Sequence, residues 1–91
     1  LILKLIRTLT VHNCFVYALL INKDNELISG AGDSKIKIWN METGQVNRTL
    51  TGHTSGVWSL VINSENELIS GSNDTTIKIW NMETGQVRQT L

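Results

Sequence analysis

The sequence predicts an all-β protein built from antiparallel four-stranded sheets. A 41-residue repeat aligns residues 10–50 with residues 51–91, and 26 of the 41 positions are identical without a gap. Within each repeat, four short runs rich in β-forming residues alternate with clusters of turn residues, which is the pattern of an antiparallel meander. No long segment carries an i, i+3, i+4, i+7 apolar stripe that would favour a helix.

In the second repeat the first predicted strand is largely apolar, whereas the third alternates apolar and polar positions, as a strand with one buried face does. Asn, Asp, Ser and Gly residues fill the turns between the strands. Gly85 ends the third turn, where a positive φ suits glycine because it lacks a Cβ atom. The predicted strands are residues 57–62, 67–71, 76–80 and 86–91.

The first repeat has Gly44 in the position of Gly85 and predicts equivalent strands at residues 15–21, 26–30, 35–39 and 45–50. Residues 5–9 match residues 46–50 and 87–91, so they are expected to form an outer strand of their own. Upstream the match fails, because residues 1–4 do not continue the repeat. The predicted organisation is therefore a lone outer strand in residues 1–9, followed by repeats at 10–50 and 51–91.

The length of the repeat narrows the architecture further. A period in the forties is typical of a β-propeller blade or of a HEAT-type helix pair. The strand pattern favours the propeller blade.

Composition argues against several classes of function. Eight basic and eight acidic residues balance to a formal charge of zero and are scattered singly, so binding to nucleic acid or to a membrane is not expected. The apolar run at residues 1–9 is too short to span a bilayer. The single cysteine, Cys14, cannot form an internal disulfide or anchor a zinc cluster alone. With no secretion signal seen, we expect a cytoplasmic or nuclear location. The turn at residues 29–33 lacks the lysine of a phosphate-binding loop, and no cofactor is expected.

Four landmarks recur in register in the two repeats. The second repeat has Gly52-His53, Ser70-Gly71, Asp74 and Trp80-Asn81, and the first has Val11-His12, Ser29-Gly30, Asp33 and Trp39-Asn40. In this order and spacing they resemble the WD40 repeat over about residues 5–91. The resemblance implies two WD40-type β-propeller blades preceded by one closing strand. Two departures are that both Trp-Asp pairs are Trp-Asn, and that Val11 replaces the usual glycine.

The resemblance implies that one His, Ser, Asp and Trp in each blade form a buried polar network. A hydrolase triad is the alternative, because each set contains Ser, His and Asp. The set occurs once per repeat, however, and no Gly-x-Ser-x-Gly elbow surrounds either serine. We therefore expect a structural role, no enzymatic activity, and histidines that pair with aspartate rather than with a metal. The two sets are His12, Ser29, Asp33 and Trp39, and His53, Ser70, Asp74 and Trp80.

The resemblance also implies where a partner binds. Three positions per blade dominate the face that carries the loop before the first strand and the second turn. Once the two network tryptophans are set aside, all the remaining aromatic residues fall on these positions, and aromatic side chains are typical of interface hot spots. The alternative is that these side chains pack between blades or at the channel rim. The positions are Phe15, Tyr17, Gly32, Gly56, Trp58 and Asn73.

The function expected from these features is a non-catalytic scaffold that presents this face to a protein or peptide. The alternatives are a regulatory or targeting module of a larger multidomain enzyme, and a self-assembling or lectin-like ring. Each blade buries its faces against its neighbours, so two blades form an incomplete ring. We expect further WD40 blades in the same chain, following Leu91 and closed by residues 5–9, or else identical chains as partners.

Overall fold

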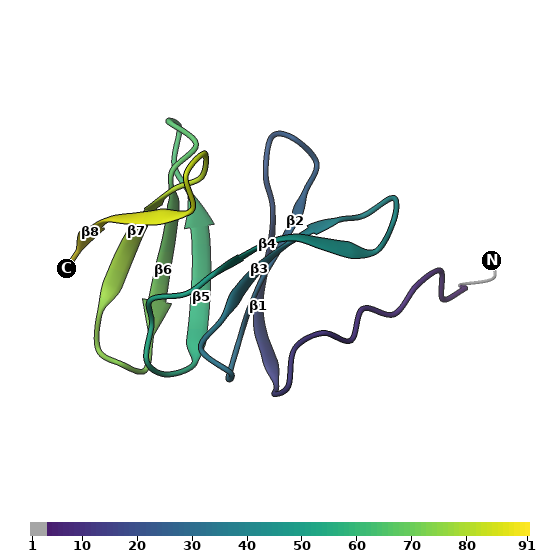
Figure 1. The fold of residues 1–91 in the computed structure, drawn as a ribbon, viewed down its shortest axis with the longest axis horizontal. Helices are drawn as coiled ribbons and strands as arrows, with labels where there is room; N and C mark the ends of the chain where they lie inside the picture. Colours follow the sequence, from purple (N-terminus) through teal and green to yellow (C-terminus); the bar gives the residue numbers. More distant parts are fainter. Residues whose placement is uncertain (1–3) are drawn as a thin grey trace.

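The computed structural model describes residues 4–91, which form two four-stranded antiparallel sheets standing side by side (Figure 1). Residues 1–3 of the predicted outer strand lie outside the described residues. Each sheet is a meander in sequence order, so the prediction of two all-β, four-stranded blades is confirmed. The strands are β1 (Val16–Ile21), β2 (Leu27–Ala31), β3 (Ile36–Asn40), β4 (Gln45–Leu50), β5 (Val57–Ile62), β6 (Leu68–Ser72), β7 (Ile77–Asn81) and β8 (Gln86–Thr90).

The observed strand ends agree with the prediction to within one residue. The second strand of each sheet starts one residue later than predicted, because the preceding glutamate belongs to the first turn. The side chains of Asn22 and Asn63 hold this turn: each Oδ1 accepts a hydrogen bond from the backbone N–H of Glu26 or Glu67, at 2.9 Å in both sheets. This asparagine therefore fixes where β2 and β6 begin.

The turns also contain residues in the left-handed region. Gly44 and Gly85 have φ values of 76° and 75°, as predicted for the third turn. In the second turn, Ser34 and Thr75 adopt φ values of 69° and 72°. Non-glycine residues pay for this conformation with steric strain, so the surrounding hydrogen bonds must hold the second turn in place.

Two β-bulges recur at equivalent places in the two sheets. Between β1 and β2, and again between β5 and β6, the register shifts so that Tyr17 and Trp58 are left without a partner residue. Between β3 and β4, and between β7 and β8, the extra residues are Asn47 and Arg88. A bulge bends the strand and redirects the side chain of the extra residue, so both bulges determine which side chains reach the ends of the sheets.

The hydrophobic core lies between the two sheets rather than within either one. Gly30 on β2 permits the close approach of Val57 on β5, because a Cβ atom at Gly30 would lie 2.7 Å from Val57 Cγ1. Isoleucines from one face of the first sheet meet branched side chains and a tryptophan from the facing side of the second. The buried cluster comprises Ile28, Ile36, Ile38, Leu50, Val57, Leu60, Leu68 and Trp80.

Residues 4–10 form no strand, so the predicted outer strand at residues 5–9 is not paired within the described chain. A strand requires a neighbouring strand for its hydrogen bonds, and neither sheet offers one at this position. Arg7 and Leu9 nevertheless lie over Gly44 in the same way that Arg48 and Leu50 lie over Gly85. The segment thus runs along the first sheet as β4 runs along the second, and its pairing stays a prediction.

Substitutions at Gly30 and Gly71 test the packing between the sheets. The two glycines occupy equivalent positions of the repeat, but only Gly30 lies against a residue of the other sheet. The nearest atom to a Cβ at Gly71 is Ser59 Cβ, at an ordinary contact distance of 3.8 Å. We expect Gly30→Ala to lower the free energy of unfolding by about 1–3 kcal/mol through overpacking. Gly71→Ala should leave it unchanged or raise it slightly, because alanine restricts the unfolded chain. Urea denaturation measures both, and equal losses would contradict the tight contact.

Candidate functional site

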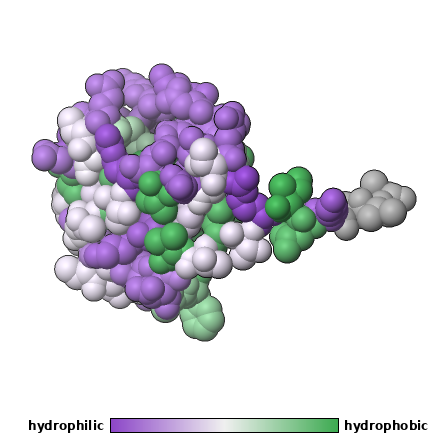
Figure 2. Space-filling model, turned by 45° about the vertical axis from the view of Figure 1, so that its right-hand side comes forward, coloured by the Kyte–Doolittle hydropathy of each residue, from purple (hydrophilic) through white to green (hydrophobic). Residues whose placement is uncertain are grey.

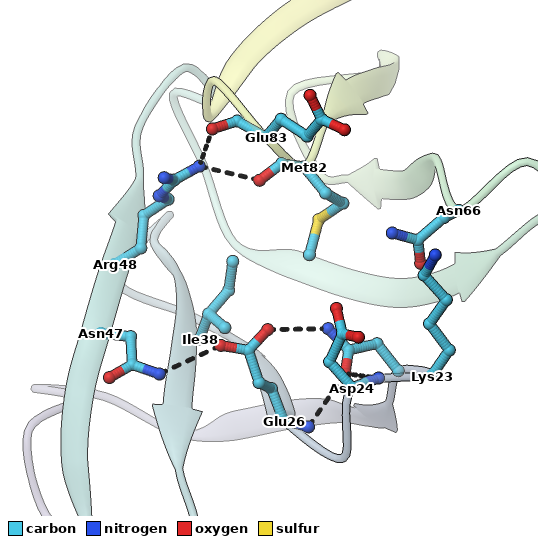
Figure 3. A pocket seen from close by; sticks show the side chains of 10 residues that line it. Lys23, Asp24, Glu26, Ile38, Asn47, Arg48, Asn66, Met82 and Glu83 are labelled. Atoms are coloured by element: carbon cyan, nitrogen blue, oxygen red, sulfur yellow. Dashed lines mark hydrogen bonds between the residues drawn. The ribbon is translucent and has the colours of Figure 1, made fainter.

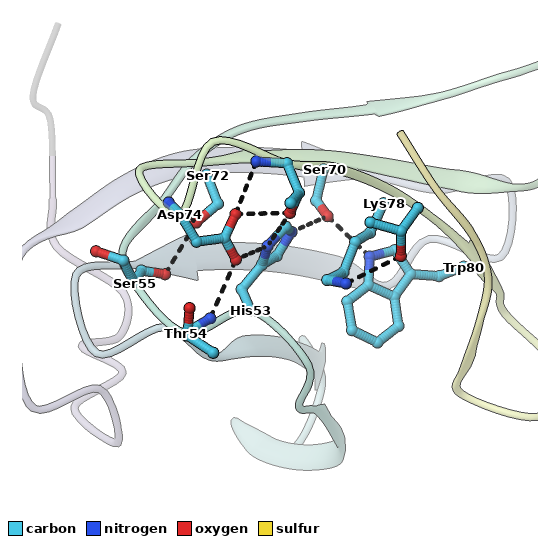
Figure 4. Close-up of polar contacts among 10 residues, drawn as sticks. His53, Thr54, Ser55, Ser70, Ser72, Asp74, Lys78 and Trp80 are labelled. Atoms are coloured by element: carbon cyan, nitrogen blue, oxygen red, sulfur yellow. Dashed lines mark hydrogen bonds and ion pairs between the residues drawn. The ribbon is translucent and has the colours of Figure 1, made fainter.

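A network of four polar side chains crosses the second sheet (Figure 4). His53 comes from the loop between β4 and β5, Ser70 from β6, Asp74 from the turn between β6 and β7, and Trp80 from β7. His53 Nδ1 lies 2.8 Å from Asp74 Oδ2, and His53 Nε2 lies 2.7 Å from Ser70 Oγ. Trp80 Nε1 donates to the same hydroxyl at 2.8 Å. The four side chains therefore join one loop, one turn and two strands.

The order of donors in this network follows from the groups at its ends. The indole N–H of Trp80 can only donate, and an ionised carboxylate can only accept. Ser70 accepts from the indole and donates its own hydrogen to His53 Nε2, while Nδ1–H of the neutral imidazole donates to Asp74. With this tautomer each side chain is satisfied by its neighbours in the set.

Asp74 is the most strongly held member of the network. Its second oxygen, Oδ1, accepts from the hydroxyl of Thr76 at 2.6 Å and from the Thr76 backbone N–H at 2.9 Å. The backbone N–H of Thr54 donates to Oδ2 at 3.1 Å. Burial alone would raise the pKa of the carboxyl, but the hydrogen bonds from Thr76, His53 and Thr54 outweigh it and hold the pKa of Asp74 well below 3.8.

The first sheet contains an equivalent network. His12 Nδ1 lies 3.0 Å from Asp33 Oδ2 and His12 Nε2 lies 2.6 Å from Ser29 Oγ, which also accepts from Trp39 Nε1 at 2.8 Å. Lys35 replaces the threonine and gives Asp33 only a backbone N–H, at 3.0 Å. The pKa of Asp33 is again lowered, because hydrogen bonds from His12 and the backbone outweigh the effect of burial.

Both networks place Asp, His and Ser in the order of a hydrolytic triad, but the serines are badly placed for attack. Ser70 has 0% of its surface exposed and Ser29 has 3%. Each hydroxyl is already held between an indole donor and an imidazole acceptor. A nucleophile must reach a bound substrate, so this geometry favours bracing of the blade over acyl transfer.

All six sequence-predicted partner-binding residues lie together at one end of the molecule. This group, called the aromatic surface below, lies where the loops before β1 and β5 approach the second turn of each sheet. The backbone N–H of Gly32 donates to the carbonyl of Phe15 at 2.8 Å, and the N–H of Asn73 donates to the carbonyl of Gly56 at 3.0 Å. The aromatic surface comprises Phe15, Tyr17, Gly32, Gly56, Trp58 and Asn73.

The centre of the aromatic surface is a stacked pair of rings from the two sheets. The ring centroids of Tyr17 and Trp58 lie 3.9 Å apart with an interplanar angle of 15°. Phe15 flanks the pair, with its centroid 6.3 Å from that of Tyr17. Tyr17 is 37% exposed, Trp58 47% and Phe15 75%. The stack therefore packs between the blades and leaves part of each ring exposed, while contact of these rings with a partner stays a prediction.

The glycines of the aromatic surface keep it open. A Cβ atom at Gly56 would lie 3.3 Å from the Cα of Gly32, so the two turns approach each other directly beneath the rings. A Cβ at Gly32 would lie 2.8 Å from the Sγ of Cys14, a neighbour that sequence analysis did not assign to this surface. Cys14 directly precedes Phe15 in the sequence, and this adjacency is the signal that could have placed Cys14 at the aromatic surface.

A cavity of about 430 Å³, which was not predicted from the sequence, lies between the sheets at the end opposite the aromatic surface (Figure 3). Arg48 of β4 reaches across it and donates to the carbonyls of Met82 and Glu83, at 2.8 and 3.0 Å. On its floor Asn47 donates to Glu26 at 3.0 Å. The sequence signal that could have indicated this contact is that Arg7 and Arg48 occupy equivalent positions, 41 residues apart, in the repeated outer strand. Arg48 thereby fastens the first sheet to the last turn of the second.

Two further observations concern other kinds of site. Within residues 4–91, no group of three or more His, Cys, Asp or Glu side chains is placed to hold a metal ion. The same residues contain no helix with the length and apolar character needed to cross a membrane.

Comparison with known proteins gives a consistent result. The family model described as "WD domain, G-beta repeat" matches residues 3–40 and 44–81. The crystal structure of the WD40 beta propeller domain of Doa1 superposes with a TM-score of 0.85 at 34% sequence identity. The alignment covers 90% of this chain and 28% of that one, so the present chain spans less than a third of the matched propeller. No curated protein sequence matches.

Removal of the central hydroxyl should affect the two networks unequally. Ser70→Ala leaves Trp80 Nε1 and His53 Nε2 without a partner on the side of the second sheet that the first sheet covers, at roughly 1–3 kcal/mol for each group. Ser29→Ala should lower the free energy of unfolding less, because Ser29, His12 and Trp39 border a cavity of about 150 Å³ on the open side of the first sheet that admits water. Urea denaturation compares the variants, and a larger loss for Ser29→Ala would contradict this difference.

The lowered pKa of Asp74 predicts the acid limb of the stability profile. A carboxyl whose pKa is lower in the folded state stabilises that state fully above its unfolded pKa, and the contribution is lost as the pH falls from 3.8 towards the folded value. Wild-type stability should therefore decline below about pH 4. Asp74→Asn should be less stable at neutral pH and should converge on the wild type in acid. Urea midpoints between pH 7 and pH 2 check this, and parallel curves would refute it.

Proposed function

The chain belongs to the WD40-repeat family, and on that basis we propose that it is a non-catalytic interaction scaffold whose aromatic surface binds a protein or peptide. WD40 domains generally bind proteins or peptides, and their fold is typically a non-catalytic scaffold. Because the chain spans 28% of the Doa1 propeller chain that it matches, the activity and partners of any larger protein are part of the proposal. A cytoplasmic or nuclear location is proposed with it, in keeping with the unpaired, exposed Cys14.

The stacked pair of Tyr17 and Trp58 is the observation that carries this proposal. The two rings come from different sheets, and the equivalent β-bulges in β1 and β5 bring them to the same end. Bulges are common next to functional sites because they redirect side chains. A pair of rings held in place by stacking loses little conformational freedom on binding, which favours affinity.

The chemistry around the rings indicates the kind of partner. The oxygens of both aspartates at this end, Asp33 and Asp74, already accept hydrogen bonds inside the networks and are largely buried, so they offer few free acceptor sites to a ligand. The exposed aromatic edges and the bare backbone of Gly32 and Gly56 favour an apolar or aromatic side chain laid against the rings. A peptide with such an anchor fits the surface better than a highly charged one.

The same surface would also serve a propeller that targets or regulates an enzyme domain elsewhere in a larger polypeptide. The alignment covers only 28% of the Doa1 chain, so the match is compatible with a larger polypeptide that contains an enzyme domain. The two candidates differ in what is attached to the propeller, and they make the same claim about the aromatic surface.

Peptides selected from a random display library on the 91-residue chain test the proposal. Tyr17→Ala and Trp58→Ala should each weaken binding of the selected peptides by about 30-fold, the loss expected for a hot-spot aromatic residue worth about 2 kcal/mol. The melting temperature should fall only modestly, since the stack is lost but both side chains are partly exposed. Fluorescence titration measures the affinity and calorimetry the melting temperature.

The control for these variants is Val61→Ala, an exposed β5 residue that is not part of the aromatic surface. It should bind the peptides as the wild type does. Unchanged peptide affinity in the Tyr17 and Trp58 variants would refute the proposal, and a large loss of melting temperature would assign those side chains to the core instead.

A further inference from the structure

The cavity of about 430 Å³ between the two sheets has the size of a ligand site. Pockets that hold small ligands measure about 300–1,000 Å³. We propose that this cavity binds a guanidinium group, such as the head of an arginine side chain, which pairs with the carboxylate of Glu26. The cavity lies at the end opposite the aromatic surface, so this proposal stands or falls separately from the proposed function.

The second sheet shows which group this glutamate binds. Glu67 is the equivalent of Glu26, and its Oε2 forms an ion pair with Nε of Arg88. Its Oε1 accepts a hydrogen bond from Asn63 Nδ2 at 2.9 Å, just as Glu26 Oε1 accepts one from Asn22 Nδ2 at 3.0 Å. The two carboxylates are therefore held in the same way, and the one in the second sheet binds a guanidinium.

In the first sheet the cation is missing from this place. Asn47 stands where the second repeat has Arg88, and its amide nitrogen donates to Glu26 Oε2 at 3.0 Å. An amide is neutral, and within residues 4–91 no Lys, Arg or His side chain forms an ion pair with Glu26. An ionised carboxylate has about four lone-pair positions, and side chains use two of those of Glu26. Both charge and acceptor positions are therefore left for a ligand.

The residues around the cavity belong to the part of the repeat that varies. Although 26 of the 41 aligned positions are identical, four residues that line the cavity differ from their equivalents in the second repeat. One of them, Arg48, bonds to the carbonyls of Met82 and Glu83 and thereby closes one wall. The four are Lys23, Asp24, Asn47 and Arg48. The cavity is thus a feature of this pair of sheets and is not repeated in each blade.

The charges that line the cavity favour a cation. Three acidic and two basic side chains line it, so the negative charges are in excess by one. Nη1 of Arg48 is already engaged by two carbonyl oxygens, and Lys23 is an exposed residue whose ammonium group is free to stay in water. The charged residues are Asp24, Glu26, Glu83, Lys23 and Arg48.

Apolar side chains in the cavity fit the stem of an arginine. Figure 3 shows the Met82 side chain pointing into the cavity from the second sheet, while Ile38 and Glu26 line it from the first. Arginine lays its methylene groups along apolar surface and keeps its head polar. The planar guanidinium also matches a carboxylate with several N–H donors at once, which the ammonium group of lysine does not. The lining therefore favours arginine over lysine.

The surroundings of the cavity are polar. Figure 2 shows that the end of the molecule that holds the cavity, at the top of the view, is covered mainly by hydrophilic side chains. Exposed polar residues of the two first turns lie at this end, among them Asp24, Asn25, Ser64 and Glu65. This environment suits a hydrophilic segment, in contrast to the apolar anchor proposed for the aromatic surface.

Binding of a single arginine should be weak. In the equivalent pair of the second sheet the Arg88 side chain is 50% exposed and that of Glu67 is 20% exposed. Water screens ion pairs that are this exposed. The experiment must therefore detect binding in the millimolar range, which a titration followed by nuclear magnetic resonance does.

Titration of the 91-residue chain with the peptide acetyl-Gly-Arg-Gly-amide tests the proposal. The side-chain amide signals of Asn22 and Asn47 should shift and saturate, whereas the indole signal of Trp58 at the aromatic surface should not move. The same peptide with citrulline, whose side chain has a similar shape but no charge, should give no saturable shift. Agmatine distinguishes the sources of the guanidinium. Tighter binding of the arginine peptide assigns it to a partner protein, and equal binding assigns it to a small guanidinium compound.

Asn47→Arg is the sharpest variant, because it rebuilds in the first sheet the pair that Arg88 and Glu67 form in the second. It fills the site from within, so the saturable shift should disappear. Glu26→Gln removes the charge and should weaken binding by about fivefold. Glu42→Gln is the matched control, since it removes the same charge from an exposed residue that does not line this cavity. It should bind the peptide as the wild type does.

Three results would overturn the proposal. They are the absence of a saturable shift in the wild type, equal binding of the citrulline peptide, and undiminished binding by folded Asn47→Arg protein. The last variant keeps the test decisive should Glu26→Gln fail to fold, because an arginine at the equivalent position is already accommodated in the second sheet.

Discussion

The packing of the isoleucine face of the first sheet on the second sheet is the contact on which the rest of the structure depends. A single four-stranded sheet of this size has no core of its own, and three of the eight buried cluster residues come from β2 and β3 while most of the others lie across the interface. Gly30 brings the backbones close, and Arg48 fastens the far end of the same interface. The stack of Tyr17 on Trp58 covers the other end of that interface, so its geometry depends on the same contact.

The polar networks have a different role from the packing between the sheets, because they position loops and turns and do not join one sheet to the other. His53 and Asp74 tie the incoming loop and the second turn to the serine and tryptophan on the strands. The second turn contains the strained residues Ser34 and Thr75, and it needs such support to keep its shape. The aromatic surface rests directly on these loops and turns. A triad-like arrangement of side chains therefore holds the backbone on which the aromatic surface rests.

Much of this structure could be predicted from the sequence, for identifiable reasons. The repeat and its turn residues located all eight observed strands to within one residue, since alternation and turn chemistry are local properties, whereas the strand predicted at residues 5–9 is not paired in the described chain. The six residues of the aromatic surface were chosen through a family resemblance, and the structure brings them together. The bulges at Tyr17 and Trp58, the crossing of Arg48 and the contact of Cys14 with Gly32 were missed. These depend on the register and spacing of two sheets, which no local pattern encodes.

A comparison of the two repeats shows where the sheets are free to differ. The positions that bury the second sheet against the first carry identical residues in the first repeat, as with Val57 and its equivalent Val16. Ten of the fifteen positions that differ lie at residues 11–18 and 31–35 and their equivalents, which build the end that carries the aromatic surface; four of the others, Lys23, Asp24, Asn47 and Arg48, line the cavity at the opposite end. There each blade has its own chemistry: Gly56 is the equivalent of Phe15, and Asn73 is the equivalent of Gly32. Packing fixes what the blades share, so the end where they differ most is the part of the molecule that packing constrains least.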